Sequence, residues 1–143
     1  MTEVSKGYRE VEEFLNGWQE EIPAVKGCFA RLVAGIRALE GVTCTFMARP
    51  GISYSLRPKH HRQQDRSFFM VIDIIDDDPE ARWLSVCFYA DLVNDPDGRG
   101  EVIPGGLAGG DGYCFDLFAD DEDLMSYLEK RCIEAYGSVK VGR

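Results

Sequence analysis

The chain has 143 residues, of which 45% are hydrophobic and 29% are charged. This composition is typical of a folded globular protein and excludes an intrinsically disordered one. The length fits one domain, so we expect residues 1–143 to form a single unit. With 25 Asp+Glu against 16 Lys+Arg, the formal net charge is −9. Because phosphate-backbone binding depends on a positive surface, we expect no nucleic-acid partner.

The apolar segments of the chain are all shorter than the ~20 residues needed to cross a bilayer. No stretch has the basic amphipathic form of a membrane-surface helix, so we expect no membrane partner. Residues 1–6 lack the charged-then-apolar layout of a signal peptide. These features predict a cytoplasmic protein.

Two amphipathic helices are predicted at the start of the chain. Apolar residues recur at helical spacing over residues 8–22 and again over residues 25–39. Pro23 interrupts the pattern and fits the first turn of the second helix. Gly41 then suits a left-handed C-terminal cap. We expect the two helices to form a helical hairpin.

A β-hairpin is predicted next, because the apolar period changes to two over residues 42–48 and 52–57. Pro50 and Gly51 lie between the two segments. A two-residue turn would place the apolar residues of the two strands on opposite faces of the sheet. We therefore expect an odd-length loop or a bulge, with Ala48 opposite Ile52.

The remaining pattern predicts three more strands and a final helix. Residues 67–75 and 82–90 are nearly continuous apolar runs, which is typical of well-shielded central strands. Residues 113–118 form a fifth strand, and Asp120 caps a helix that ends at Gly137.

Between the fourth and fifth predicted strands, residues 91–112 show no clear element. Loops this long are usually functional lids, disordered, or contain an element that the pattern hides. Here the hidden element would be a short strand at residues 102–103. The order of elements predicts a two-layer α+β fold, with three helices and a mostly antiparallel sheet of about five strands.

The five cysteines are an odd number, have no C-x-x-C spacing, and fall inside apolar segments. This pattern predicts buried free thiols rather than disulfides or a zinc site. The adjacent His60 and His61 would point apart on an extended chain, so we expect no metal site and no cofactor. The cysteines are Cys28, Cys44, Cys87, Cys114 and Cys132.

One segment of this acidic chain is basic. Residues 41–66 contain five basic residues and one acidic residue, a net charge of +4 against −9 for the whole chain. Arg49 lies at the tip of the first hairpin, more than about 20 Å from the others. The remaining basic residues are expected in one exposed connection between strands, where arginine forks suit carboxylate or phosphate. These candidate ligand-binding residues are Arg57, Lys59, His60, His61, Arg62 and Arg66.

The same loop also fits a solvated surface that balances an acidic protein. The glycine-rich residues 98–112 lack the spacing of a phosphate-binding loop, and a strand follows them where such a loop needs a helix. Two interpretations remain for them, a mobile flap over a neighbouring cleft or a surface loop whose glycines adopt positive φ angles.

Three functions follow from these patterns. The first is non-enzymatic binding of a small anionic ligand near residues 57–66, with the glycine-rich segment as a cover. The alternative is a protein-interaction or self-association module, in which the basic loop meets an acidic surface or a sheet edge pairs with a partner or second copy. The third is an enzyme that uses Cys or His, for which no local motif is present.

Overall fold

A computed structural model describes residues 3–20 and 24–141. Its helices are α1 (Glu3–Gly17), α2 (Lys26–Arg37) and α3 (Glu122–Lys140). Its strands are β1 (Val42–Arg49), β2 (Ser53–His60), β3 (Met70–Ile75), β4 (Trp83–Tyr89), β5 (Glu101–Leu107) and β6 (Gly110–Leu117).

The six strands form one antiparallel sheet in the order β1-β2-β3-β4-β6-β5. The α+β class and the antiparallel sheet are therefore confirmed, and β3 and β4 are central, as predicted. The sheet has six strands rather than about five, because the glycine-rich segment contains β5.

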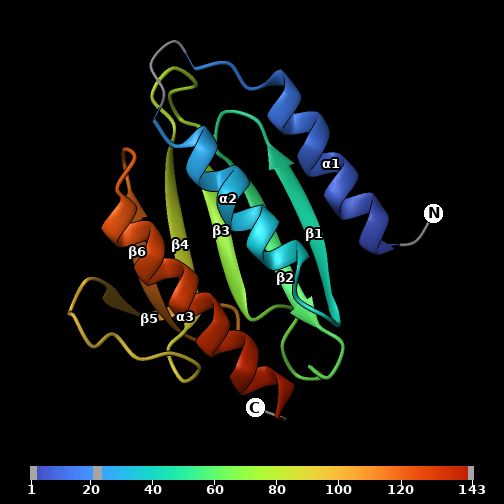
Figure 1. Cartoon of the computed structure of the whole chain (residues 1–143), viewed down its shortest axis with the longest axis vertical. Coiled ribbons are helices and arrows are strands. Elements are labelled where there is room, and N and C mark those ends of the chain that lie inside the picture. The colour runs from blue at the N-terminus through green and yellow to red at the C-terminus, as the bar shows by residue number, and fades with distance from the viewer. Residues whose placement is uncertain (1–2, 21–23, 142–143) are drawn as a thin grey trace.

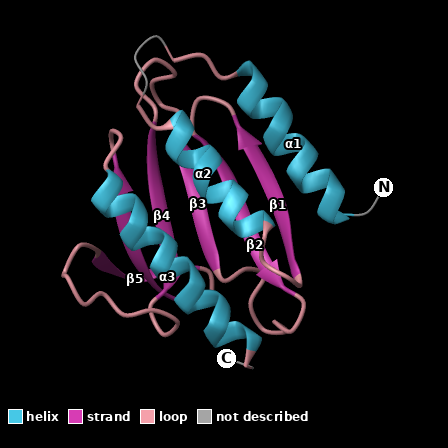
Figure 2. Cartoon of the chain, viewed as in Figure 1, coloured by secondary structure: helices cyan, strands magenta, loops and turns pink. Residues whose placement is uncertain are grey.

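All three helices lie on one face of the sheet (Figures 1 and 2). Helix α1 packs along β1, where the Phe14 ring contacts those of Phe46 and Tyr54 at 5.5 and 4.3 Å between centroids. Helices α1 and α2 run in opposite directions, as a helical hairpin requires. The opposite face of the sheet carries none of the described helices.

The core fills the space between the sheet and the helices. Alternate strand residues point into it, and many of them are fully buried. Helix α2 adds Phe29 and Ile36, and α3 adds Met125 and Leu128. The apolar strand residues with no exposed surface are Leu56, Met70, Ile72, Ile74, Leu84, Val86 and Phe88.

Salt bridges also connect helices α2 and α3. Arg31 of α2 bonds to Glu122 and Glu129 of α3, each at 2.6 Å. The arginine side chain is 38% exposed, so this network contributes modestly to stability, although its fork of donors fixes how the two helices lie.

Some predicted helix boundaries are wrong. Helix α1 ends at Gly17, well before residue 22, and the expected role of Pro23 lies outside the described residues. Helix α3 is capped by Asp121 rather than Asp120 and continues through Gly137 to Lys140. Buried residues on both sides of Gly137 extend the packed face and outweigh its low helix propensity. Helix α2 ends at Arg37 with Ala38 as its C-cap, so Gly41 is not the helix cap, although it does have the predicted positive φ of +80°.

The first hairpin has the predicted odd-length loop, but its register is shifted by two residues. Ala48 lies opposite Tyr54 rather than Ile52. Pro50 and Gly51 form a tight turn in which the Ile52 N–H donates to the Arg49 carbonyl, with Gly51 at φ +84°. Ile52 is therefore left outside the ladder and is 60% exposed.

Close packing of α1 on β1 gives a testable prediction. A Cβ at Gly7 would lie 2.1 Å from the main-chain oxygen of Cys44, so Gly7→Ala must push the helix off the strand. We expect a loss of about 1–3 kcal/mol in unfolding free energy.

Gly35→Ala in α2 is the matched control, because a Cβ there has nothing within 4 Å. It should stabilise the protein by about 0.5–1 kcal/mol, since alanine is the better helix former. Urea unfolding measures both changes. Equal effects of the two substitutions would contradict the close approach.

Candidate functional site

The structure divides the six predicted site residues among three places. Strand β2 extends to His60, so Arg57 and Lys59 lie within the strand rather than in a loop. Pro58 does not end β2, because the residue-by-residue pairing with β3 stops at Leu56 and no ladder bond is lost at the proline. The prediction of one exposed basic connection is therefore wrong.

Arg57 and Lys59 point to the helix-free face of the sheet, because side chains alternate along a strand and His60 points to the other face. The Arg57 Nε donates to the Ser55 hydroxyl at 3.1 Å, and both basic side chains are partly buried. The sheet separates them from His60, which points to the helix-covered face, whereas Arg57 and Arg66 both lie over the stacked rings of Phe68 and Tyr89.

Arg66 is already paired. Its guanidinium makes a bidentate contact with the Asp91 carboxylate at 2.7 and 2.8 Å, and it stacks 3.8 Å from the centre of the Tyr89 ring. These contacts raise the pKa of Arg66, the Asp91 bond being the largest cause. This residue holds the loop after β2 against the end of β4.

The other three residues, His60, His61 and Arg62, meet the C-terminal end of α3. They line a pocket of about 410 Å³ whose wall is completed by Glu40, Tyr136, Lys140 and Val141. In Figure 1 the end of α3 lies beside the connection from β2 to β3. We call this the α3-end pocket.

His60 is the buried member of the pocket, with 2% of its surface exposed. Its Nδ1 accepts the Arg62 main-chain N–H at 3.1 Å, so the neutral ring carries its proton on Nε2. The pKa of His60 is lowered by burial first, and then by the nearby His61, Arg62 and Lys140. His60 therefore shapes the pocket as a neutral ring, packed edge-on to Tyr136.

His61 is exposed and lies against His60, with 4.3 Å between ring centroids. Its Nδ1 is 3.4 Å from the Gly41 carbonyl oxygen, which can only accept a hydrogen bond, so Nδ1 is the donor when this bond forms. A Cβ at Gly41 would lie within 3 Å of both imidazoles, so this position needs glycine for space as well as for its positive φ.

Arg62 and Lys140 are the cations of the pocket. The Arg62 Nη1 donates to the main-chain oxygen of Lys140 at 3.0 Å, which satisfies a carbonyl at the end of α3. Within the described part of the chain, the remaining guanidinium donors of this exposed residue have no other hydrogen-bond partner. The Lys140 ammonium lies 5.4 Å from the centre of the Tyr136 ring.

A buried glutamine orders the loop that carries these groups. The Gln63 Oε1 accepts the His60 main-chain N–H at 3.0 Å, and its Nε2 donates to the Phe68 carbonyl at 2.8 Å. Both ends of the amide are thus used to hold the loop closed. The pocket consequently has a fixed wall on the side of β2.

Tyr136, Lys140 and Glu40 were not among the predicted site residues. Two of them lie in α3, 70 and 74 residues after Arg66, the last residue of the basic segment. Only the packing of α3 over β2 brings them to His60, and no local pattern signals that contact.

The glycine-rich segment does not cover this pocket. Residues 101–107 form β5, and the turn after it is tied down by a hydrogen bond of 2.5 Å from the Tyr89 hydroxyl to the Ala108 carbonyl. The preceding loop is held to α3, where Tyr127 donates to Asp95 and Asn94 bonds to Glu134. The interpretation of a mobile flap is therefore not supported by these contacts.

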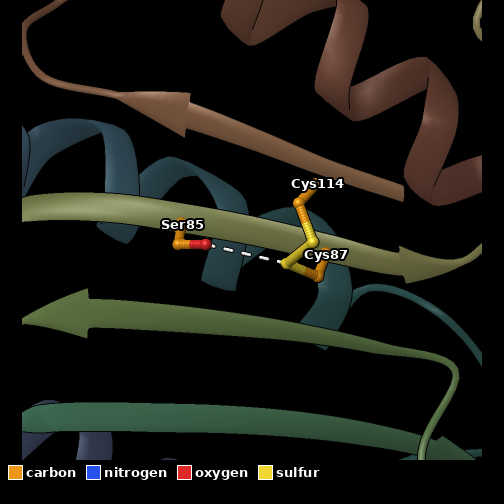
Figure 3. Close-up of a disulfide and its surroundings, with 3 residues drawn as sticks. All are labelled: Ser85, Cys87 and Cys114. Atoms are coloured by element: carbon orange, nitrogen blue, oxygen red, sulfur yellow. Dashed lines mark hydrogen bonds between the residues drawn. A yellow bond between two sulfur atoms is a disulfide. The ribbon is translucent and has the colours of Figure 1, made fainter. Parts of the chain in front are cut away.

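The prediction of five free thiols is wrong for two of the cysteines. Cys87 and Cys114 form a disulfide between β4 and β6 on the helix-free face (Figure 3). The other three are buried free thiols, as predicted: Cys28, Cys44 and Cys132.

A second cavity, of about 590 Å³, lies at the opposite end of the sheet, between the end of α1 and the turn from β3 to β4. Its lining includes Trp18, Arg82 and Phe118. Arg82 is paired with the buried Asp76 at 2.7 Å, so its charge is already neutralised. This cavity is therefore a weaker candidate for an anion-binding site than the α3-end pocket.

No known protein family, curated protein or solved structure matches the chain. Among residues 3–20 and 24–141, no helix has the length and apolar character needed to span a membrane. The same described residues contain no cluster of three or more His, Cys, Asp or Glu side chains arranged to hold a metal ion.

Proposed function

We propose that the protein is a binding domain for a small anionic ligand, which occupies the α3-end pocket. The observation that carries this proposal is the convergence of Arg62, Lys140 and two imidazoles on one concavity of an acidic protein. The pocket volume of about 410 Å³ lies in the lower part of the range for ligand sites, which suits phosphate, sulfate or a small carboxylate.

The donors have distinct roles in this proposal. Arg62 offers a planar fork to two oxygens of the anion, and Lys140 offers a point charge. His60 contributes shape rather than charge, because burial keeps it neutral. Glu40 is the carboxylate of the lining, and it opposes the anion.

The test is a thermal-shift screen with phosphate, sulfate, citrate and nucleotides. A ligand at 100 times its dissociation constant adds about 2.7 kcal/mol of stability, which corresponds to a shift of roughly 8 °C in Tm. We expect Arg62→Ala/Lys140→Ala to weaken the binding by about tenfold or more, since each charged hydrogen bond is worth about 1.5–3 kcal/mol. Glu40→Gln should strengthen it.

The matched control is Arg57→Ala/Lys59→Ala. It removes the same formal charge, but from the opposite face of the sheet. Unchanged binding in the control with loss in Arg62→Ala/Lys140→Ala supports the pocket. Equal losses of affinity in both variants would show that binding depends only on the net charge of the protein, which would contradict a site in this pocket. Full binding without Arg62 and Lys140 would overturn the proposal.

We also propose a second function, self-association through the helix-free face. The feature behind this proposal is Phe118, directly after β6, whose side chain is 64% exposed at one end of that face. Phe118 lies against Trp83, with 4.9 Å between ring centroids. Exposed apolar patches of this kind mark contact surfaces. The edge strand β5 is a poor alternative, because Pro104 and a bulge interrupt its ladder.

Analytical ultracentrifugation of the native protein at low and high salt tests this second function. An apolar contact persists at high salt, whereas a contact between basic loop and acidic surface weakens. Phe118→Asp should abolish the dimer, and Ile133→Asp should preserve it because that residue is 56% exposed on α3, away from this face. A monomer at every salt concentration would exclude self-association.

A further inference from the structure

The disulfide joins two residues that already face each other in the sheet. Cys87 of β4 and Cys114 of β6 are direct cross-strand partners, with 4.1 Å between their Cα atoms. The backbone ladder on either side holds the two strands together without it. The bond is therefore not needed to form this part of the fold.

The two sulfurs differ in access. Cys114 is partly exposed on the helix-free face, whereas Cys87 is 9% exposed. The Ser85 hydroxyl lies 3.6 Å from the Cys87 Sγ and is the donor when that sulfur is in the bridge (Figure 3). An incoming thiolate thus reaches Cys114, and Cys87 is the leaving group that the Ser85 hydroxyl stabilises.

The three free cysteines do not attack the Cys87–Cys114 disulfide. Burial raises the pKa of Cys44 to about 11 and that of Cys132 to about 12. Burial and the neighbouring Asp120 also raise the pKa of Cys28. Because the thiolate is the nucleophile, these three thiols are inert towards the bridge near neutral pH.

We propose that Cys87–Cys114 is a reversible redox site that is reduced by a dithiol protein. A thiolate of the reductant attacks the Cys114 Sγ, forming a mixed disulfide, and Cys87 departs as a thiolate that takes up a proton. The second thiol of the reductant then attacks its own mixed-disulfide sulfur and releases Cys114, which is also protonated. Two electrons pass to the protein, and the reductant ends as a disulfide.

The charge around the bridge selects the reductant. Glu101 of β5 lies opposite Cys114, and Asp116 is two residues along β6 on the same face. Burial, and then the negative charge of Glu101, raise the pKa of Asp116. The two carboxylates repel an anionic thiol, so the site fits a reductant with a basic surface around its reactive thiol.

Reduction also frees a segment of the chain. The bridge closes residues 88–113, which contain the loop to β5 and β5 itself. Strand β5 pairs only with β6 among the described strands, and a bulge interrupts that ladder. We expect amide exchange in residues 101–107 to rise by about tenfold or more on reduction, with exchange in β1 and β2 unchanged.

The first test is the reduction of the native protein by dithiothreitol, followed by alkylation and mass spectrometry. We expect a rate proportional to the dithiothreitol concentration, because attack occurs on the folded protein. In Cys87→Ser, the remaining Cys114 should form a mixed disulfide with oxidised glutathione about tenfold faster than Cys87 does in Cys114→Ser. A rate that does not depend on dithiothreitol, or faster reaction at Cys87, would overturn the proposal.

The second test uses charged small thiols at low salt. Cysteamine, a cation, should reduce the bridge several-fold faster than the anion mercaptoethanesulfonate at equal thiolate concentration. Glu101→Gln should bring the ratio of the two reduction rates closer to one. Glu80→Gln, in the turn before β4, should leave that ratio unchanged. Equal rates for both thiols on the unmodified protein would overturn the assignment of a basic reductant.

Discussion

Asp76→Ala should lower the free energy of unfolding by about 3–5 kcal/mol, the usual effect of removing one partner of a buried ion pair. The side chains of Asp76 and Arg82 are 3% and 13% exposed and lie 2.7 Å apart. The second carboxylate oxygen accepts the Gly51 N–H at 2.8 Å. The substitution therefore leaves a buried guanidinium without its carboxylate partner and also removes the hydrogen bond to the turn of the first hairpin.

Aromatic rings make the unpaired charge more costly. The Arg82 guanidinium lies 5.3–5.4 Å from the centres of the rings of Phe14, Trp18 and Tyr54. These ring faces attract the cation but cannot replace the hydrogen bonds of the carboxylate. Urea unfolding at neutral pH measures the loss. Asp77→Ala, at the exposed neighbouring position, should change stability by no more than about 0.5 kcal/mol. A loss below about 1 kcal/mol for Asp76→Ala would contradict the role given to this pair.

The same carboxylate makes stability depend on pH. Burial alone would raise the pKa of Asp76, but the Gly51 N–H and the Arg82 guanidinium together hold it below the usual value. A lowered folded-state pKa gives stability that is present above the unfolded pKa of about 3.9 and is lost as the pH falls through the folded value. The stability difference between the unmodified protein and Asp76→Ala should therefore shrink between about pH 4 and pH 2.

Asp76 also explains a limit of prediction from the sequence. The apolar period of two in residues 42–57 predicts which side chains of the first hairpin share a face, and the structure confirms it for the residues of the ladder but not for Ile52. The register is shifted because Asp76 binds the turn at Gly51 and donates its own N–H to the Ile52 carbonyl. Those partners are about 25 positions apart in the sequence, so no local pattern contains them.

Strand β5 was predicted only in part, as one possible short strand at residues 102–103, and the reason differs from that of the hairpin register. Its residues are almost all exposed, so it lacks the alternation that a half-buried strand shows. Pro104, Gly105 and Gly106 interrupt it, and these residue types predict a loop. The strand forms because β6 offers a ladder on its free side, which is a property of the sheet rather than of the segment.

The candidate site was predicted in part. Three of the six basic-loop residues line the α3-end pocket, and the charge pattern was the signal that found them. Arg57 and Lys59 were grouped with them because they are neighbours in the sequence, yet the alternation of β2 sends them to the other face. Lys140 joins the site only through the packing of α3.

Cys87→Ser/Cys114→Ser should lower the free energy of unfolding by about 3.5 kcal/mol, which is the loop-closure value for a separation of 27 residues. The corresponding drop in Tm is about 10 °C for a chain of this size. The stabilisation arises in the unfolded chain, since the bridge restricts residues 88–113 there, while β4 and β6 remain paired in the folded protein without it.

Reduction supplies the matched control for this prediction. Dithiothreitol should lower the stability of the unmodified protein to that of the double variant, and it should leave the double variant unchanged, because Cys28, Cys44 and Cys132 are free thiols in both. Urea unfolding with and without reductant makes the comparison. A protein whose stability is the same in the oxidised and reduced states would show that the bridge does not constrain the unfolded chain. A loss of the expected size makes the redox state of Cys87 and Cys114 a determinant of how much folded protein is present, since a change of 1.4 kcal/mol is a tenfold change in the unfolding equilibrium.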